Sequence, residues 1–192
     1  NTNWIEPDLA YEEAVKAVLR RIGASRDFLD DFEPFAARVG AAGERVALAQ
    51  VVLKLTSPGV PDIYRGDELG FRALVDPDNR RPVDWDRRRD LLAHVKGASS
   101  APEEFDLRKL WLTERLLALR AERPAAFAGS YEPLDAGPDV CAFVRAGELQ
   151  VAAAIREGAT LPAPPPGWRD LLPGIAGIGV HASRSGRIAT VR

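Results

Sequence analysis

The sequence contains a single cysteine, Cys141, and no methionine. One cysteine excludes an internal disulfide framework and fits a reducing compartment, so we expect a cytoplasmic protein. No apolar run is long enough to predict a transmembrane helix, and no charged start followed by an apolar core predicts a signal peptide. The missing methionine and the abrupt start at Asn1 predict a piece of a longer chain, although removal of an initiating methionine would also explain them.

The chain also has little excess charge, with a net charge of −2. This balance gives no reason to expect a nucleic acid or a membrane as a partner. Of the 192 residues, 46% are hydrophobic and 28% are charged, which is the composition of an ordinary globular protein. The length is sufficient for one large domain or two small ones.

Helical spacing of apolar residues dominates the first two thirds of the chain. The helix predicted over residues 25–55 should break near Gly40 or Gly43. The helix predicted over residues 105–122 is apolar on two faces, which indicates packing against two layers. Four helices are predicted, over residues 7–22, 25–55, 86–96 and 105–122.

Short β-type runs separated by turns replace this pattern after Pro124. Their spacing predicts a small antiparallel sandwich, with a hairpin turn at residues 146–148 and a domain boundary within residues 123–129. The predicted strands cover residues 131–134, 140–144, 149–155, 168–172, 179–182 and 187–191.

A short strand is predicted over residues 60–64, and the long polar loop after it contains side chains of the types that bind sugars. Carboxylates, amides and guanidinium groups hydrogen-bond a polyol, while aromatic faces pack on its rings. A loop of this length is typically functional or disordered, although spacing alone favours a salt-bridged surface loop. The candidate side chains are Tyr64, Phe71, Asp76, Asp78, Asn79, Arg80, Arg81, Asp84 and Trp85.

The identities of the residues in this stretch are more informative than their spacing. Ser57-Pro-Gly-Val-Pro-Asp-Ile-Tyr64 and Leu74-Val-Asp-Pro-Asp-Asn-Arg-Arg-Pro-Val-Asp84 resemble the region around the eighth barrel strand in glycoside hydrolase family 13, the α-amylase superfamily. Within that superfamily the match resembles the maltooligosyl trehalose synthases. Trp4-Ile-Glu-Pro7 and Tyr11-Glu-Glu-Ala-Val15 are similar to the same family just upstream.

The resemblance implies an α/β region followed by an all-β region. Residues 1–124 would form the carboxy-terminal portion of a (β/α)8 barrel, namely its last strand and helices. Residues 125–192 would form a small antiparallel β-sandwich domain. The site of such a barrel lies at the carboxyl ends of its strands.

The resemblance also implies a reaction. Enzymes of this family convert the reducing-end α-1,4 linkage of a maltooligosaccharide into an α,α-1,1 linkage by intramolecular transfer. Their catalytic carboxylates would fall before Asn1, and Asp62, Asp67 and Glu68 match none of them. We therefore expect no catalytic residue in this chain, and no activity from this chain alone.

Residues that bind the substrate are carried over one by one. Asp76 and Arg80 match residues that hold a glucose on the donor side of the cleaved bond, and Tyr64 lies at the strand end beside them. Asn79 and Arg81 are expected to support this pair. The remaining candidate, Trp85, is either a core residue or a platform for a sugar ring.

The expected partner is a maltooligosaccharide or another α-glucan, without a cofactor or a metal. Asp76-Pro-Asp78-Asn79 resembles the start of a calcium loop, but Arg81 and Arg87 replace the glycine and glutamate that such a loop needs. Two other functions remain open: a different glucan hydrolase of the superfamily, or a stand-alone, non-catalytic glucan-binding module. An incomplete barrel would expose strand edges and apolar helix faces, so we expect self-association or a fold that depends on the missing part.

Overall fold

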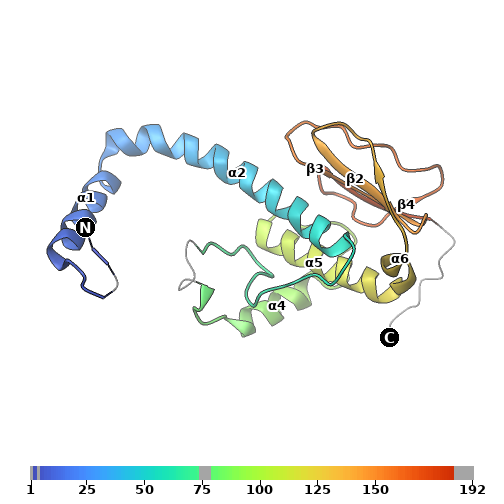
Figure 1. Cartoon of the computed structure of the whole chain (residues 1–192), viewed down its shortest axis with the longest axis horizontal. Helices are drawn as coiled ribbons and strands as arrows, with labels where there is room; N and C mark the ends of the chain where they lie inside the picture. The colour runs from blue at the N-terminus through green and yellow to red at the C-terminus, as the bar shows by residue number, and fades with distance from the viewer. Residues whose placement is uncertain (1, 4, 74–78, 184–192) are drawn as a thin grey trace. The chain divides into compact units, whose positions relative to one another are not determined.

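The structure is a computed structural model that describes residues 2, 3, 5–73 and 79–183. It contains helices followed by strands (Figure 1). The helices are α1 (Leu9–Gly23), α2 (Arg26–Thr56), α4 (Trp85–Val95), α5 (Phe105–Glu122) and α6 (Pro124–Ala128). The strands are β1 (Tyr131–Leu134), β2 (Val140–Arg145), β3 (Leu149–Ala154), β4 (Arg169–Asp170) and β5 (Ile178–Ala182).

The chain divides into two compact units, Asn1–Gly43 and Glu44–Arg192. In the first unit, the Asp8 side chain caps α1 by accepting a hydrogen bond of 3.0 Å from the backbone N–H of Tyr11. All residues of α1 are described, and none of them is buried. This helix therefore presents both its polar and its apolar faces to solvent.

Helix α2 does not break at Gly40 or Gly43, so that prediction was wrong. A glycine inside a helix costs about 1 kcal/mol relative to alanine, which weakens the helix without ending it. The real end lies at Thr56, shortly before Pro58, as Pro58 disfavours helical backbone at the residue before it. The second unit thus begins within a continuous helix.

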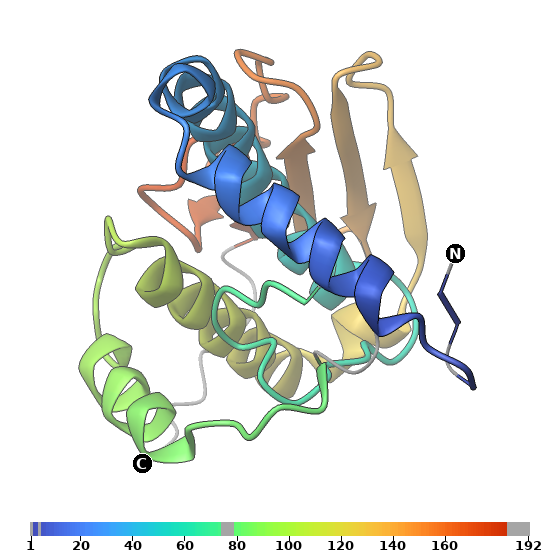
Figure 2. The same cartoon turned by 90° about the vertical axis from the view of Figure 1, so that its left-hand side faces the viewer.

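In the second unit, α5 lies between α4 and the sheet (Figure 2). Residues 109–113 of α5 are all buried, and five consecutive residues cover more than one full helical turn. This confirms the prediction that α5 packs on two sides. The core joins the carboxy-terminal part of α2, helix α5 and one face of the sheet, with Val52, Leu55, Trp111, Leu112, Leu116, Phe143, Val151 and Val180 at its centre.

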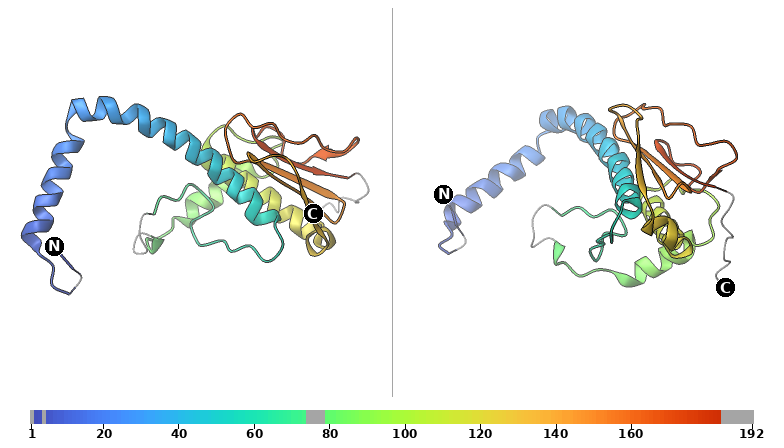
Figure 3. Two further views of the ribbon diagram at one scale, coloured as in Figure 1. Left: turned by 45° about the horizontal axis from the view of Figure 1, so that its top comes forward. Right: turned by 45° about the vertical axis from the view of Figure 1, so that its right-hand side comes forward.

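The five described strands form one antiparallel sheet in the order β1-β2-β3-β5-β4, which Figure 3 shows in two orientations. Side chains alternate between its two faces. Phe143, Val151 and Val180 are paired across β2, β3 and β5 and belong to the main core. Val140, Ala142 and Ala152 belong to a smaller cluster on the other face. Both faces of the central strand β3 are therefore covered.

The predicted hairpin between β2 and β3 is confirmed. Ala146 and Gly147 both have positive φ, 49° and 65°, and the Glu148 N–H donates to the Arg145 carbonyl at 2.9 Å. Left-handed backbone at successive turn residues matches the twist of the flanking strands. Glycine adopts this conformation readily, whereas alanine does so with strain.

The sequence correctly predicted helices followed by antiparallel strands. The described strands lie in one sheet, however, and its inner face packs on helices where a second sheet was expected. Residues 60–64 were also expected to be a strand, but they are irregular, because a strand needs a neighbour to pair with and the described ladders all lie elsewhere. The predicted strand at 187–191 lies outside the described residues. Among the described helices, none has the length and apolarity needed to cross a bilayer.

Candidate functional site

Two arginines fix the point at which the polar loop leaves α2. Arg120 of α5 donates to the carbonyls of Leu55 and Gly59 at 2.9 and 2.8 Å. Arg145 of β2, only 1% exposed, donates to the carbonyl of Thr56 at 3.2 Å. Carbonyls at the end of a helix lack helical partners and carry partial negative charge, so cations stabilise them. The first residues of the loop are thereby attached to both α5 and the sheet.

A tight turn follows at residues 64–67. The backbone N–H of Asp67 donates to the carbonyl of Tyr64 at 3.0 Å, and Gly66 has a φ of 92°. A β-carbon at Gly66 would lie 3.3 Å from Cγ2 of Val83. Position 66 thus combines left-handed backbone with a close neighbour, and both favour glycine.

Two lysines hold the carboxylate of Asp67 from opposite sides. Lys54 of α2 lies 3.1 Å from Oδ2, and Lys109 of α5 lies 2.8 Å from Oδ1. Lys109 is 6% exposed and also donates to the carbonyl of Leu69 at 2.9 Å. Burial acts to raise the pKa of Asp67, but the hydrogen bonds and charges of Lys109 and Lys54 outweigh it and lower that pKa. Asp67 is therefore a stably ionised anchor between two helices.

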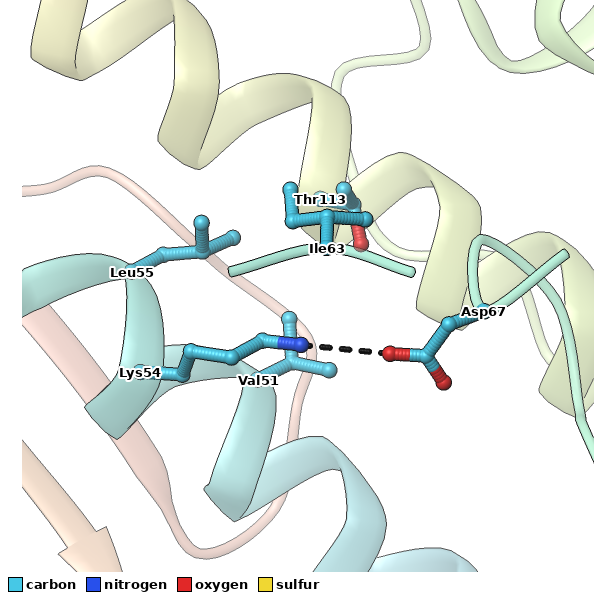
Figure 4. A pocket seen from close by; sticks show the side chains of 6 residues that line it. All are labelled: Val51, Lys54, Leu55, Ile63, Asp67 and Thr113. Carbon is cyan, nitrogen blue, oxygen red and sulfur yellow. Dashed lines mark hydrogen bonds and ion pairs between the residues drawn. The ribbon is translucent and has the colours of Figure 1, made fainter. Parts of the chain in front are cut away.

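A small hollow opens beside this anchor, as Figure 4 shows. It has room for about 10 Å³, which is roughly one water molecule, and so is far too small for an organic ligand. Its wall is half apolar, and Asp67 and Lys54 meet at its rim. The lining residues are Val51, Lys54, Leu55, Ile63, Asp67 and Thr113.

Further ion pairs attach the loop to α4. Arg88 binds Glu68 at 3.0 Å and donates to the Gly66 carbonyl at 3.0 Å, while its guanidinium lies 5.9 Å from the centre of the Trp85 ring. Helix α4 itself begins at an N-cap, since the Asp84 side chain accepts from the backbone N–H of Arg87 at 2.9 Å. Both ends of the loop are thus attached to the helical layer.

Asp106 at the start of α5 makes a similar connection. Its Oδ1 accepts from the N–H of Gly70 at 2.8 Å, and its Oδ2 pairs with Arg87 at 3.1 Å. One carboxylate thereby joins the loop, α4 and α5.

The candidate binding residues surround this framework. Tyr64 and Trp85 are exposed, at 46% and 47%, as a platform for a sugar ring would need to be. Arg80 and Arg81 are exposed and Asn79 is half-buried. The expected partner of Arg80, Asp76, lies outside the described residues.

One contact connects two of the predicted segments. Nη2 of Arg65 donates to the carbonyl of Arg80 at 3.3 Å, which joins the turn at 64–67 to the second half of the loop. The side chain of Arg65 therefore connects the residue next to Tyr64 with the backbone of Arg80, although fourteen residues separate Arg65 from Arg80 in the sequence.

Comparison with known proteins identifies the relatives of this chain. No family model matches it. It is 34% identical over 193 aligned residues to the "Putative maltooligosyl trehalose synthase" of Mycobacterium tuberculosis, a match that covers 93% of this chain and 24% of that protein. A crystal structure of maltooligosyl trehalose synthase superposes with a TM-score of 0.80 at 27% identity, over 94% of this chain and 28% of that one. The chain is homologous to the maltooligosyl trehalose synthases.

The chain spans about a quarter of the length of the maltooligosyl trehalose synthases that it matches. A second structure, from Sulfolobus tokodaii, supports the same fold with a TM-score of 0.77 at 24% identity. The amylopullulanase of Thermoanaerobacter thermohydrosulfuricus is 35% identical over 104 residues, which cover 54% of this chain. These matches relate the chain to enzymes of the α-amylase family over part of their length.

Neither Asp67 nor Glu68, the two carboxylates at the turn, has the surroundings of a glycosidase acid, because each is bound by a cation. Retaining glycosidases need a nucleophile and an acid about 5 Å apart, and the acid needs a raised pKa. The pKa of Asp67 is shifted in the opposite direction, and Glu68 is paired with Arg88. Within the described ranges, no cluster of three His, Cys, Asp or Glu side chains could hold a metal ion.

Sequence reasoning missed the residues that hold the loop, above all Lys54, Lys109 and Asp106. One signal was available for Lys109, since it lies in a helix that was expected to be buried on two sides. A lysine in such a helix requires an anionic or carbonyl partner. That partner is Asp67, which lies 42 residues from Lys109 in the sequence. A local sequence pattern does not reveal a contact between residues so far apart.

Proposed function

We propose that this chain is a substrate-binding part of a maltooligosyl trehalose synthase. The whole protein would convert the reducing-end α-1,4 linkage of a maltooligosaccharide into an α,α-1,1 linkage by intramolecular transfer. The observation that carries this proposal is the match over 93% of the chain at 34% identity. The catalytic carboxylates would be supplied by another part of a longer protein, so this chain alone would be inactive.

In this proposal, Asp76 and Arg80 hold one glucose on the donor side of the cleaved bond. Tyr64 and Trp85 offer ring faces, and their exposure leaves these faces accessible to a sugar. Asn79 and Arg81 support the polar contacts. No cofactor, metal, nucleic acid or membrane takes part.

The finer architecture is part of the same proposal. Residues 60–64 would be the eighth strand of a (β/α)8 barrel that is completed by the rest of the protein. Residues 1–124 would then belong to that barrel, and residues 125–192 would form the carboxy-terminal β domain. A partner strand from the completed barrel would give residues 60–64 the pairing that a strand needs.

The proposal is tested by incubating a longer protein that contains this chain with maltohexaose. The mutase reaction lowers the number of reducing ends without releasing glucose or shorter maltooligosaccharides. The 192-residue chain alone, the matched control, should change neither quantity. Unchanged reducing ends with the longer protein would contradict the proposal.

A second candidate is a glucan hydrolase of the α-amylase family. It is favoured by the 35% identity to an amylopullulanase over 104 residues, which cover 54% of this chain and 6% of that protein. The same assay separates the two candidates, since hydrolysis raises the number of reducing ends. Glucan binding by the chain alone, with no activity of any longer protein, would instead indicate a non-catalytic binding module.

A further inference from the structure

We infer that Asp67, held between Lys54 and Lys109, is a positioning residue for the glucan-binding side of the loop. This inference rests on the proposed function. Asp67 need not touch the substrate, because it acts through the turn that it closes and through the residues attached to that turn.

The ion pairs of Asp67 anchor the turn to the core. Lys109 comes from the second turn of α5 and Lys54 from the last turn of α2, so the carboxylate of Asp67 joins two helices that both belong to the core. A lysine that is 6% exposed loses most of its hydration, and an ionised carboxylate at 2.8 Å replaces it. The bond from Lys109 to the Leu69 carbonyl adds a second attachment two residues further along.

Hydrogen bonds connect Asp67 to candidate binding residues at the surface. The N–H of Asp67 closes the turn on the carbonyl of Tyr64, and the side chain of Arg65 leaves the same turn to bind the carbonyl of Arg80. The candidate glucan-binding residues Tyr64 and Arg80 are thus joined to one half-buried anchor, Asp67, by a short series of hydrogen bonds.

Loss of the anchor should weaken glucan binding. If the anchor is removed, the turn gains alternative conformations, and ordering it again must accompany glucan binding. Contacts made equally to substrate and transition state affect KM, whereas kcat depends on the carboxylates elsewhere in the longer protein. A defect in KM with little change in kcat is therefore the expected signature.

The experiment compares four variants of the longer protein with maltohexaose as substrate. Asp67→Asn should raise KM about tenfold, with little change in kcat. Asp67→Glu, which keeps the charge, should recover most of the affinity. Lys54→Met leaves Lys109 paired and should give a smaller rise in KM. Asp139→Asn removes an exposed pair with Arg156 at 3.1 Å and is the matched control, with parameters close to wild type.

An Asp67→Asn enzyme whose KM matches that of Asp139→Asn would overturn the inference. The inference would also be overturned if Asp67→Asn raised KM and lowered kcat to a similar extent and Asp67→Glu restored neither parameter. If the wild-type longer protein shows no activity on glucans, the proposed function fails instead. Amide hydrogen exchange on the 192-residue chain then decides the positioning role: Asp67→Asn should speed exchange at residues 65–69, and unchanged exchange there would refute it.

Discussion

Arg145 is a guanidinium group inside the core, and its hydrogen-bond acceptors are the carbonyls of Thr56, Phe127 and Gly129. It joins the end of α2, the end of α6 and strand β2. A buried carbonyl that loses its donor costs about 1–3 kcal/mol, and here three would lose one donor together. The contribution of Arg145 is therefore structural, at the junction between helices and sheet.

Arg145→Met should accordingly lower the free energy of unfolding of the 192-residue chain by about 2–4 kcal/mol. Urea titration followed by circular dichroism measures this change. Arg156→Met is the control, because Arg156 is exposed and its pair with Asp139 should contribute less than about 1 kcal/mol. Equal midpoints for the two variants would contradict the role of Arg145.

The turn between β2 and β3 provides a second test at this scale. Ala146 has a φ of 49°, which is strained for a residue with a β-carbon. Ala146→Gly should stabilise the chain by about 0.5–1 kcal/mol, after the greater freedom of glycine in the unfolded state is included. Gly147→Ala, at a φ of 65°, should destabilise it by about 1 kcal/mol. Thermal unfolding of both variants checks the opposite signs.

At the scale of elements, sequence reasoning succeeded where local pattern determines structure. Helix α5 was predicted with its observed bounds of 105 and 122, because its apolar residues recur through five turns and Pro124 follows it. The β2–β3 hairpin was found from Ala146-Gly147-Glu148. Both features depend on neighbours in the sequence alone.

The failures have both local and distant causes. The glycines of α2 were overestimated as breaks, since a helix propagates through an isolated glycine at modest cost. Residues 60–64 have the composition of a strand, but pairing requires a partner that the sequence does not specify. In the candidate site, Tyr64, Arg80 and Trp85 were predicted from the motif, whereas Lys54 and Lys109 were missed because only tertiary packing brings them to Asp67.

The anchoring of the 64–67 turn predicts a dependence on pH. The pKa of Asp67 is lower in the folded chain than in the unfolded one, whose value is about 3.9. The unfolded state therefore takes up the proton first as the pH falls, so the contribution of Asp67 to stability is complete above about pH 5 and declines below about pH 4. Unfolding free energies of wild type and Asp67→Asn should differ most near neutral pH and converge in acid. A constant difference down to about pH 2 would contradict this prediction.

At the scale of the whole molecule, the exposed apolar side chains of α1 predict self-association. Leu9, Val18 and Leu19 are 68%, 56% and 61% exposed, and exposed apolar surface of this kind favours association. Light scattering should therefore give a mass above the 20.9 kDa of one chain, and Val18→Glu with Leu19→Glu should lower it. A single species of 20.9 kDa that unfolds cooperatively would contradict the prediction.

The central claim is that the loop after α2 binds glucan for a trehalose-forming enzyme. The most direct measurement is the rate at which maltohexaose loses reducing ends in a longer protein that carries Arg80→Ala. Arg89→Ala, which removes an exposed arginine paired with Asp86 within α4, is the control. We predict that Arg80→Ala lowers kcat/KM by about tenfold or more, while Arg89→Ala matches wild type. Equal rates for the two variants, or a gain of reducing ends by the wild type, would contradict the account.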